Sequence, residues 1–195
     1  MKKFSNYEST ETFKERPKLP VGAYIAVIKA AEVREYKGQN GTYEKFEVAF
    51  DITEGEYKDF YANDFKAQQS EDKKWKGVVR FYVPTDDGSE RDSWTKSTFK
   101  ANIEAIEDSN SGYSWDWDEK KLKGKKVGVL FRNEEWEFNG NTGWSARPFK
   151  LISVDSVKDG KFKLPKDKPL ANKTTTSSPP QNLDIEYIDD DDLPF

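Results

Sequence analysis

Aromatic rings stand beside cations at six places along this chain. Tyr36 is followed directly by Lys37, for example, and Arg80 and Tyr82 are two residues apart. Exposed rings stack on nucleic-acid bases, and cations contact the phosphates without reading the base sequence. The pattern therefore predicts a surface that binds a single nucleic-acid strand. Its candidate residues are Tyr36, Lys37, Tyr43, Lys45, Lys74, Trp75, Arg80, Tyr82, Arg132, Trp136, Trp144 and Arg147.

Each candidate ring also has a packing interpretation. Tyr43 and Tyr82 point outward by strand alternation, which favours binding. Trp75 and Trp144 stand where predicted strands begin, so packing against the ends of the core is an equal alternative for them. For Trp136 the alternative is that its ring covers an edge of the sheet. Three further tryptophans lie beside acidic residues and are expected to pack instead of meeting phosphate: Trp94, Trp115 and Trp117.

Enzyme chemistry has little support in this composition. The chain has no histidine and no cysteine, which excludes Ser-His-Asp triads, thiol nucleophiles and the usual zinc sites. Its many acidic residues form no recognisable constellation for a metal, and no Gly-x-x-x-x-Gly-Lys-Ser/Thr phosphate loop is present. We therefore expect a protein that is not an enzyme and that uses no metal and no cofactor.

The C-terminal end differs from the rest of the chain in charge. Residues 171–195 carry a net charge of −5, whereas residues 1–170 carry +1. Clustered like charges repel and do not pack into a core, so we expect a flexible linker over residues 166–182. Residues 183–195 then form an acidic tip, whose terminal hydrophobe favours docking on a partner over mere solubilisation. The docking residues are Asp189, Asp190, Asp191, Asp192, Leu193, Pro194 and Phe195.

Alternating apolar residues predict five strands in the body of the chain. The expected strands are 22–33, 43–52, 78–83, 127–138 and 144–154. Asn-Gly pairs within 36–41 and 139–143 predict hairpin turns. Ser93 is the expected cap of the only helix, over residues 94–107, with Phe99, Ile103 and Ile106 on its buried face. Residues 54–74 are expected to be irregular, and a last short strand is possible after Lys161.

Five strands with one helix between the third and the fourth are the order of an OB-fold. The sequence therefore predicts a mainly β fold, an OB-fold-like five-stranded antiparallel barrel, followed by a disordered acidic tail. We expect residues 1–14 to form an N-terminal arm and residues 15–165 to form an OB-like domain that binds single-stranded DNA. A homodimer is also possible, because exposed hairpins and edge strands can pair with a second copy of the chain.

The ending Asp189–Phe195 closely resembles the acidic tip of bacterial single-stranded DNA-binding proteins, in which several aspartates precede a small apolar motif ending in Pro-Phe. Gly22-Ala23-Tyr24 and Leu122–Val129 resemble phage-encoded proteins of the same functional group. The resemblance implies protection of single-stranded DNA in phage replication and recombination. It also implies that the tip recruits replication, recombination or repair proteins, with Phe195 in an apolar pocket and the aspartates facing a basic rim.

The sequence leaves two other functions open. The first is an adaptor that docks on host replication proteins through the acidic tip without binding DNA, which the near-zero charge of the body favours. The second is an annealing protein, which pairs complementary strands as well as binding them. No apolar run is long enough to span a membrane, and the first residues lack a signal peptide. We therefore expect a cytoplasmic location in a bacterial host cell, and no membrane partner.

Overall fold

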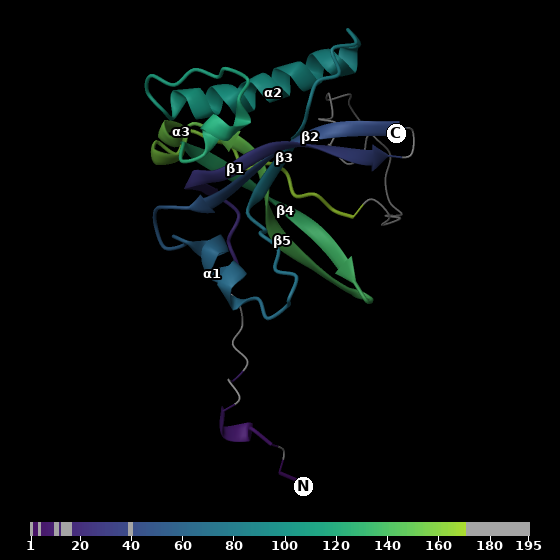
Figure 1. Cartoon of the computed structure of the whole chain (residues 1–195), viewed down its shortest axis with the longest axis vertical. Coiled ribbons are helices and arrows are strands. Elements are labelled where there is room, and N and C mark those ends of the chain that lie inside the picture. Colours follow the sequence, from purple (N-terminus) through teal and green to yellow (C-terminus); the bar gives the residue numbers. More distant parts are fainter. Residues whose placement is uncertain (1, 4, 10–11, 13–16, 39–40, 171–195) are drawn as a thin grey trace, which may run out of the picture.

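Five antiparallel strands form one sheet in the computed structural model, which describes residues 2–3, 5–9, 12, 17–38 and 41–170. Across the sheet the strands follow the order β3-β2-β1-β4-β5 (Figure 1). Their bounds are Ala23–Gly38 for β1, Gly41–Ile52 for β2, Val78–Tyr82 for β3, Lys126–Phe138 for β4 and Asn141–Ile152 for β5. The predicted mainly β class is confirmed. The hydrogen-bonded sheet is open, with β3 and β5 as its edge strands.

Helices accompany the sheet at more places than the sequence predicts. Their bounds are Phe60–Ala67 for α1, Glu90–Asp108 for α2 and Val154–Lys158 for α3, with short 3-10 turns η1 (Tyr7–Ser9) and η2 (Glu119–Leu122). The expectation of a single helix is therefore wrong. Helix α1 lies in the segment expected to be irregular, and α3 begins at Val154, where the fifth predicted strand was expected to end. Within the described ranges, no helix is long and apolar enough to cross a membrane.

All five strands and α2 contribute buried side chains to the core, and α2 covers part of it. Alternate residues of β2, from Phe46 to Ile52, are buried as predicted. Phe46 pairs with Phe81 of β3 across the sheet. The ring of Phe99, on α2, meets the Phe46 ring edge to face, with 5.6 Å between the centroids. Because strand side chains alternate between faces, the residues between these core positions face away from α2.

Helix α2 begins four residues earlier than predicted. Ser89, and not Ser93, is the N-cap, because the Ser89 hydroxyl accepts the backbone N–H of Asp92 at 3.1 Å. Ser93 lies inside the helix, where its hydroxyl donates to the backbone carbonyl of Ser89. Glu90 and Asp92 fall in the first turn, where carboxylates interact favourably with the positive end of the helix dipole. The predicted buried face, with Phe99 among its residues, is confirmed.

Two long hairpins extend from the sheet and carry most of the predicted binding residues (Figure 1). In the first, β1 continues through Tyr36 and Lys37, which were expected in a turn, as far as Gly38. In the second, β4 and β5 pair from Gly128 with Ile152 out to Phe138 with Asn141. Strand β1 pairs with β4 only over residues 23–27, so the outer parts of the two hairpins separate.

A buried carboxylate of β2 holds the start of α1. Asp51 is 1% exposed, and its carboxylate accepts the backbone N–H groups of Tyr61 and Ala62 at 3.0 and 3.2 Å. These amides belong to the first turn of α1, where the helix provides no carbonyl partner. The residue at the usual cap position, Asp59, makes no side-chain cap bond and has a left-handed backbone conformation, with φ of 58°. The helix is therefore capped from the sheet.

This capping predicts unequal effects for two aspartates. Asp51→Asn replaces one acceptor oxygen by a donor and leaves a buried amide without a partner, so we expect a loss of about 1–3 kcal/mol in the free energy of unfolding. Asp59→Asn is the matched control, since Asn tolerates a left-handed conformation, and we expect a change below about 0.5 kcal/mol. Urea unfolding measures both. Equal stability of the two variants would show that Asp51 does not cap α1.

Candidate nucleic-acid interface

Five of the predicted binding residues lie together on the sheet face that points away from α2. Tyr36 of β1 pairs with Tyr43 of β2. Lys45 of β2 pairs with Tyr82 of β3, and two residues further along Arg80 pairs with Glu47. Cross-strand partners share a face, so the register brings together candidates from three strands. We call this set, Tyr36, Tyr43, Lys45, Arg80 and Tyr82, the tyrosine face.

The three tyrosine rings form a continuous row across the strands. Tyr36 and Tyr43 are stacked, with 5.6 Å between centroids and 12° between planes. Tyr43 and Tyr82 follow at 5.5 Å with a tilt of 50°. The ammonium group of Lys45 lies over all three rings, closest to Tyr82 at 4.7 Å from its centroid. All four side chains are half-buried, so the row is supported by the sheet and still reaches solvent.

A buried glutamate supports this row from within the same face. The side chain of Glu47 is 7% exposed. Its carboxylate accepts a hydrogen bond from the Tyr36 hydroxyl and another from Nε of Arg80, the latter at 2.8 Å. Nε of Arg34 lies 3.9 Å from its second oxygen. Glu47 thus receives donors from both neighbouring strands. We call Glu47 with these partners, Arg34, Tyr36 and Arg80, the cluster.

These contacts change the acidity of the groups involved. Burial by itself would raise the pKa of Glu47, but the hydrogen bonds from Tyr36 and Arg80 and the charges of Arg80 and Arg34 outweigh it, and the pKa lies below its ordinary value. Burial, together with the hydrogen bond to Glu47, raises the pKa of the Tyr36 hydroxyl. At neutral pH the cluster therefore holds an ionised carboxylate and a neutral phenol.

The structure places Trp75 in the packing between β2, β3 and α1. Its indole N–H donates to the backbone carbonyls of Phe50 and Gly77, each at 3.1 Å. Its ring lies 5.8 Å from that of Phe65 on α1. This arrangement favours the packing alternative. Lys74 is exposed on the loop before β3, where its backbone N–H binds Gln68.

The candidates on the β4–β5 hairpin divide between its two faces. Arg132 pairs with Arg147, and Trp136 pairs with Gly143, on one face, whereas Trp144 lies on the other, opposite Glu135. Trp136 lies over Gly143, where an added Cβ would come within 2.6 Å of the indole. The two tryptophans therefore belong to different surfaces.

Arg132 is mostly enclosed. Its side chain is 12% exposed and forms an ion pair with Glu134 at 2.8 Å. The guanidinium lies 4.6 Å from the ring centroid of Phe149. Arg147 is exposed, as is Lys37, which pairs with Thr42 and projects from the side of the β1–β2 hairpin opposite Tyr36. None of these three side chains joins the tyrosine face.

The tryptophans expected to pack do so unequally. Trp115 packs against the core and meets the Phe46 ring at 6.0 Å, as predicted. Trp117 is 78% exposed and Trp94 is 41% exposed, so a large part of each side chain faces solvent and is not packed as predicted. The ring of Trp117 nevertheless stacks on Phe99, with 9° between the planes.

Two members of the cluster, Arg34 and Glu47, were not among the sequence candidates. Alternation places both on the outward side of their strands, next to candidates already identified, and this was the available signal. Their meeting depends on the register between β1 and β2, which pairs Arg34 with Lys45 and Glu32 with Glu47. Exposed Phe138 and Phe149 on the second hairpin were also missed.

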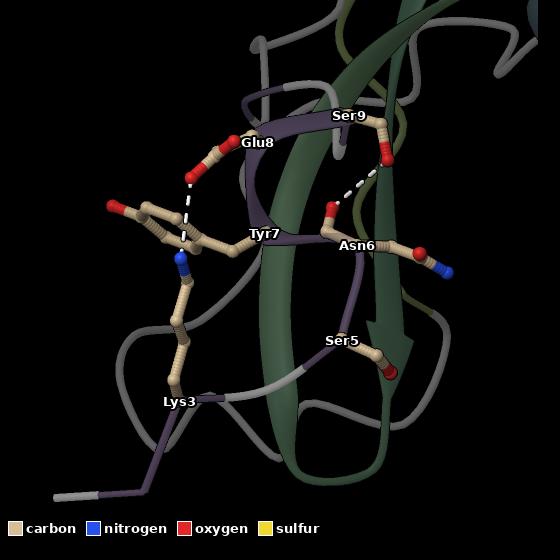
Figure 2. A pocket seen from close by; sticks show the side chains of 6 residues that line it. All are labelled: Lys3, Ser5, Asn6, Tyr7, Glu8 and Ser9. Atoms are coloured by element: carbon tan, nitrogen blue, oxygen red, sulfur yellow. Dashed lines mark hydrogen bonds and ion pairs between the residues drawn. The ribbon is translucent and has the colours of Figure 1, made fainter.

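A hollow near the N-terminus is separate from the candidates. Figure 2 shows that it is lined by Lys3, Ser5, Asn6, Tyr7, Glu8 and Ser9. All six come from one short N-terminal segment, in which Lys3 and Glu8 form an ion pair at 3.3 Å. Among the residues that the structure describes, no three acidic, histidine or cysteine side chains are grouped to hold a metal ion.

The chain matches no protein-family model and no curated protein sequence.

The predicted docking tip, Asp189–Phe195, and most of the predicted linker lie outside the described residues. The first part of the linker is described, and there Lys168 exchanges backbone hydrogen bonds with Asn133 and Glu135 of β4, each at 2.8 Å. The backbone N–H of Leu170 also donates to the Glu135 carboxylate.

The lowered pKa of Glu47 predicts a dependence of stability on pH. A carboxylate whose pKa is lower in the folded than in the unfolded state stabilises the fold above its unfolded pKa, and this contribution is lost as pH falls through the folded pKa. Glu47→Gln should therefore lose about 1–3 kcal/mol of unfolding free energy at pH 7. The difference from the original protein should narrow as the pH is lowered below 4.5, the ordinary pKa of the group.

Urea unfolding between pH 7 and pH 3 measures this difference. Glu44→Gln is the matched control, because Glu44 is an exposed carboxylate on the same strand. It should leave stability nearly unchanged over the whole range. A constant difference between Glu47→Gln and the original protein at every pH would contradict the role assigned to the Glu47 charge.

Proposed function

We propose that this protein binds single-stranded DNA without sequence preference, through the tyrosine face of β1, β2 and β3. The observation that carries the proposal is the row of three half-buried rings, Tyr36, Tyr43 and Tyr82, with Lys45 over them. Aromatic rings stack on any base, and each stack contributes about 1–3 kcal/mol. Such a surface suits a ligand whose bases are unpaired.

The charges around the rings support a polyanionic ligand. Lys45, Arg34 and Arg80 lie on the tyrosine face or beside it, and Glu47 and Glu32 offset two of these three charges. Lys45 contacts the rings, so its positive charge lies next to the surface on which bases would stack. The excess of positive charge is small, which predicts moderate affinity with a shallow salt dependence.

The same proposal includes an OB-like barrel as the fold. Three features support it: β1 lies between β2 and β4, α2 connects β3 to β4, and residues of the two edge strands β3 and β5 approach within 8 Å between Cα atoms. OB-folds bind oligonucleotides on strands 2 and 3, with the loops that join strands 1–2 and 4–5 beside them. Four of the five residues of the tyrosine face lie on β2 and β3 here, and Tyr36 lies beside them on β1.

We further propose that the tip recruits replication, recombination or repair proteins in the cytoplasm of a bacterial host. The amino-acid sequence supports this part, since four aspartates precede Leu193-Pro194-Phe195. The aspartates favour encounter with a basic surface, and Leu193 and Phe195 supply apolar area for a pocket on a partner.

Fluorescence anisotropy of labelled oligo(dT) and of a matched duplex tests the DNA-binding function directly. We expect the full-length protein to bind the single strand, to bind the duplex much more weakly, and to lose affinity as salt rises. Absence of binding to both would reject DNA binding and favour the adaptor. Faster pairing of complementary strands in the same samples would indicate an annealing protein.

Substitutions on the tyrosine face test where the strand lies. Tyr82→Ala should weaken oligo(dT) binding by about 1–3 kcal/mol. Lys45→Gln should reduce the slope of log affinity against log salt by about 0.7, the value for one phosphate contact on a single strand. Lys100→Gln is the control, because Lys100 is an exposed lysine on α2, across the sheet from the tyrosine face. An equal loss in all three variants would place the strand elsewhere.

A further inference from the structure

Two glutamates face each other across β1 and β2 in very different surroundings. Glu32 pairs directly with Glu47, so both carboxylates project from the face that carries the tyrosine row. The Glu32 side chain is 53% exposed, and its ion pair is with Arg34 at 2.6 Å. The Glu47 side chain is 7% exposed and receives donors from both neighbouring strands. Their effects on a bound polyanion should therefore differ.

Glu47 contacts the tyrosine row at one end and an arginine near its other end. On β1 it accepts from the hydroxyl of Tyr36, whose ring begins the row. On β3 it accepts from Nε of Arg80, two residues from Tyr82 at the other end. A ring held at its hydroxyl loses rotational freedom before a ligand arrives, and preorganisation of this kind lowers the entropy cost of binding.

We infer that Glu47 is a positioning residue for single-stranded DNA, although its charge has the wrong sign for a nucleic-acid site. The inference rests on the proposed function. Glu47 holds the Tyr36 ring in the orientation that stacks on Tyr43, and it directs the guanidinium of Arg80 along the sheet surface. Because the carboxylate is buried and accepts these bonds, its repulsion of phosphate is largely offset at short range.

A role through charge alone and a role in positioning predict opposite effects on DNA affinity when Glu47 is replaced. If Glu47 acted only through its charge, removing that charge would strengthen binding to a polyanion. If Glu47 acts by positioning, its removal releases Tyr36 and Arg80 and weakens binding. Glu32 provides the comparison within the same cross-strand pair, because the interaction removed there is an exposed ion pair that competes with phosphate for Arg34.

The experiment compares oligo(dT) affinities of the full-length protein at pH 7 and low salt. Glu47→Gln should bind about tenfold more weakly, and Glu32→Gln about two- to threefold more tightly. Glu47→Asp serves as a second variant, because it keeps the charge and shortens the side chain. We expect it also to bind more weakly, since one carboxylate then no longer reaches both Tyr36 and Arg80. Urea unfolding establishes that each variant is folded under the assay conditions.

A double-mutant cycle with Tyr36→Phe separates positioning from a general loss of structure. Tyr36→Phe keeps the ring and removes the hydroxyl, so it should weaken binding about threefold in the original protein and have no further effect when combined with Glu47→Gln. Independent, multiplicative effects would overturn the inference, as would unchanged or tighter binding by Glu47→Gln. Failure of the original protein to bind oligo(dT) is a different result, which rejects the proposed function itself.

Discussion

The pairing of β2 with both of its neighbours is the constraint on which the rest of this structure depends. One face of β2 supplies Phe46 and Val48 to the core, while Tyr43, Lys45 and Glu47 lie on the other face, at the centre of the candidate interface. A slip of one residue in either ladder would exchange these faces, placing Lys45 and Glu47 against α2. Burial of the apolar face therefore fixes the position of every polar group on the other, and the same register decides both packing and binding.

Charge on the candidate face is arranged by pairing and not by excess. Glu47 keeps Arg80 and Tyr36 in defined positions, and Glu32 engages Arg34, so few cations remain without an anionic neighbour on this face. Such a surface gives up some long-range attraction for polyanions and gains a fixed geometry, because every polar side chain in the cluster has a partner before a ligand arrives. This balance agrees with a body whose net charge is near zero.

The parts of the fold that depend on local periodicity could be predicted from the sequence, and the parts that depend on contacts between strands could not. Alternation identified the core residues of β2 and β3, and the outward direction of Tyr43 and Tyr82. The start of α1 was not predictable, because its cap is Asp51, a residue of another element. For the same reason the burial of Glu47 was not predictable, because the alternation of β2 by itself predicts an exposed carboxylate there. Its burial depends on Tyr36 and Arg80, which lie on different strands.

The ladder between β1 and β4 has a consequence for how the chain folds. Each long hairpin joins strands that are neighbours in the sequence, and its pairing closes only a short loop. The ladder from Ala23 with Leu130 to Val27 with Lys126 instead joins residues about 100 positions apart. The entropy of loop closure must be overcome before such distant contacts contribute, and folding slows as contacts become less local. Docking of the two hairpins through these five pairs is therefore the step that we expect to set the folding rate.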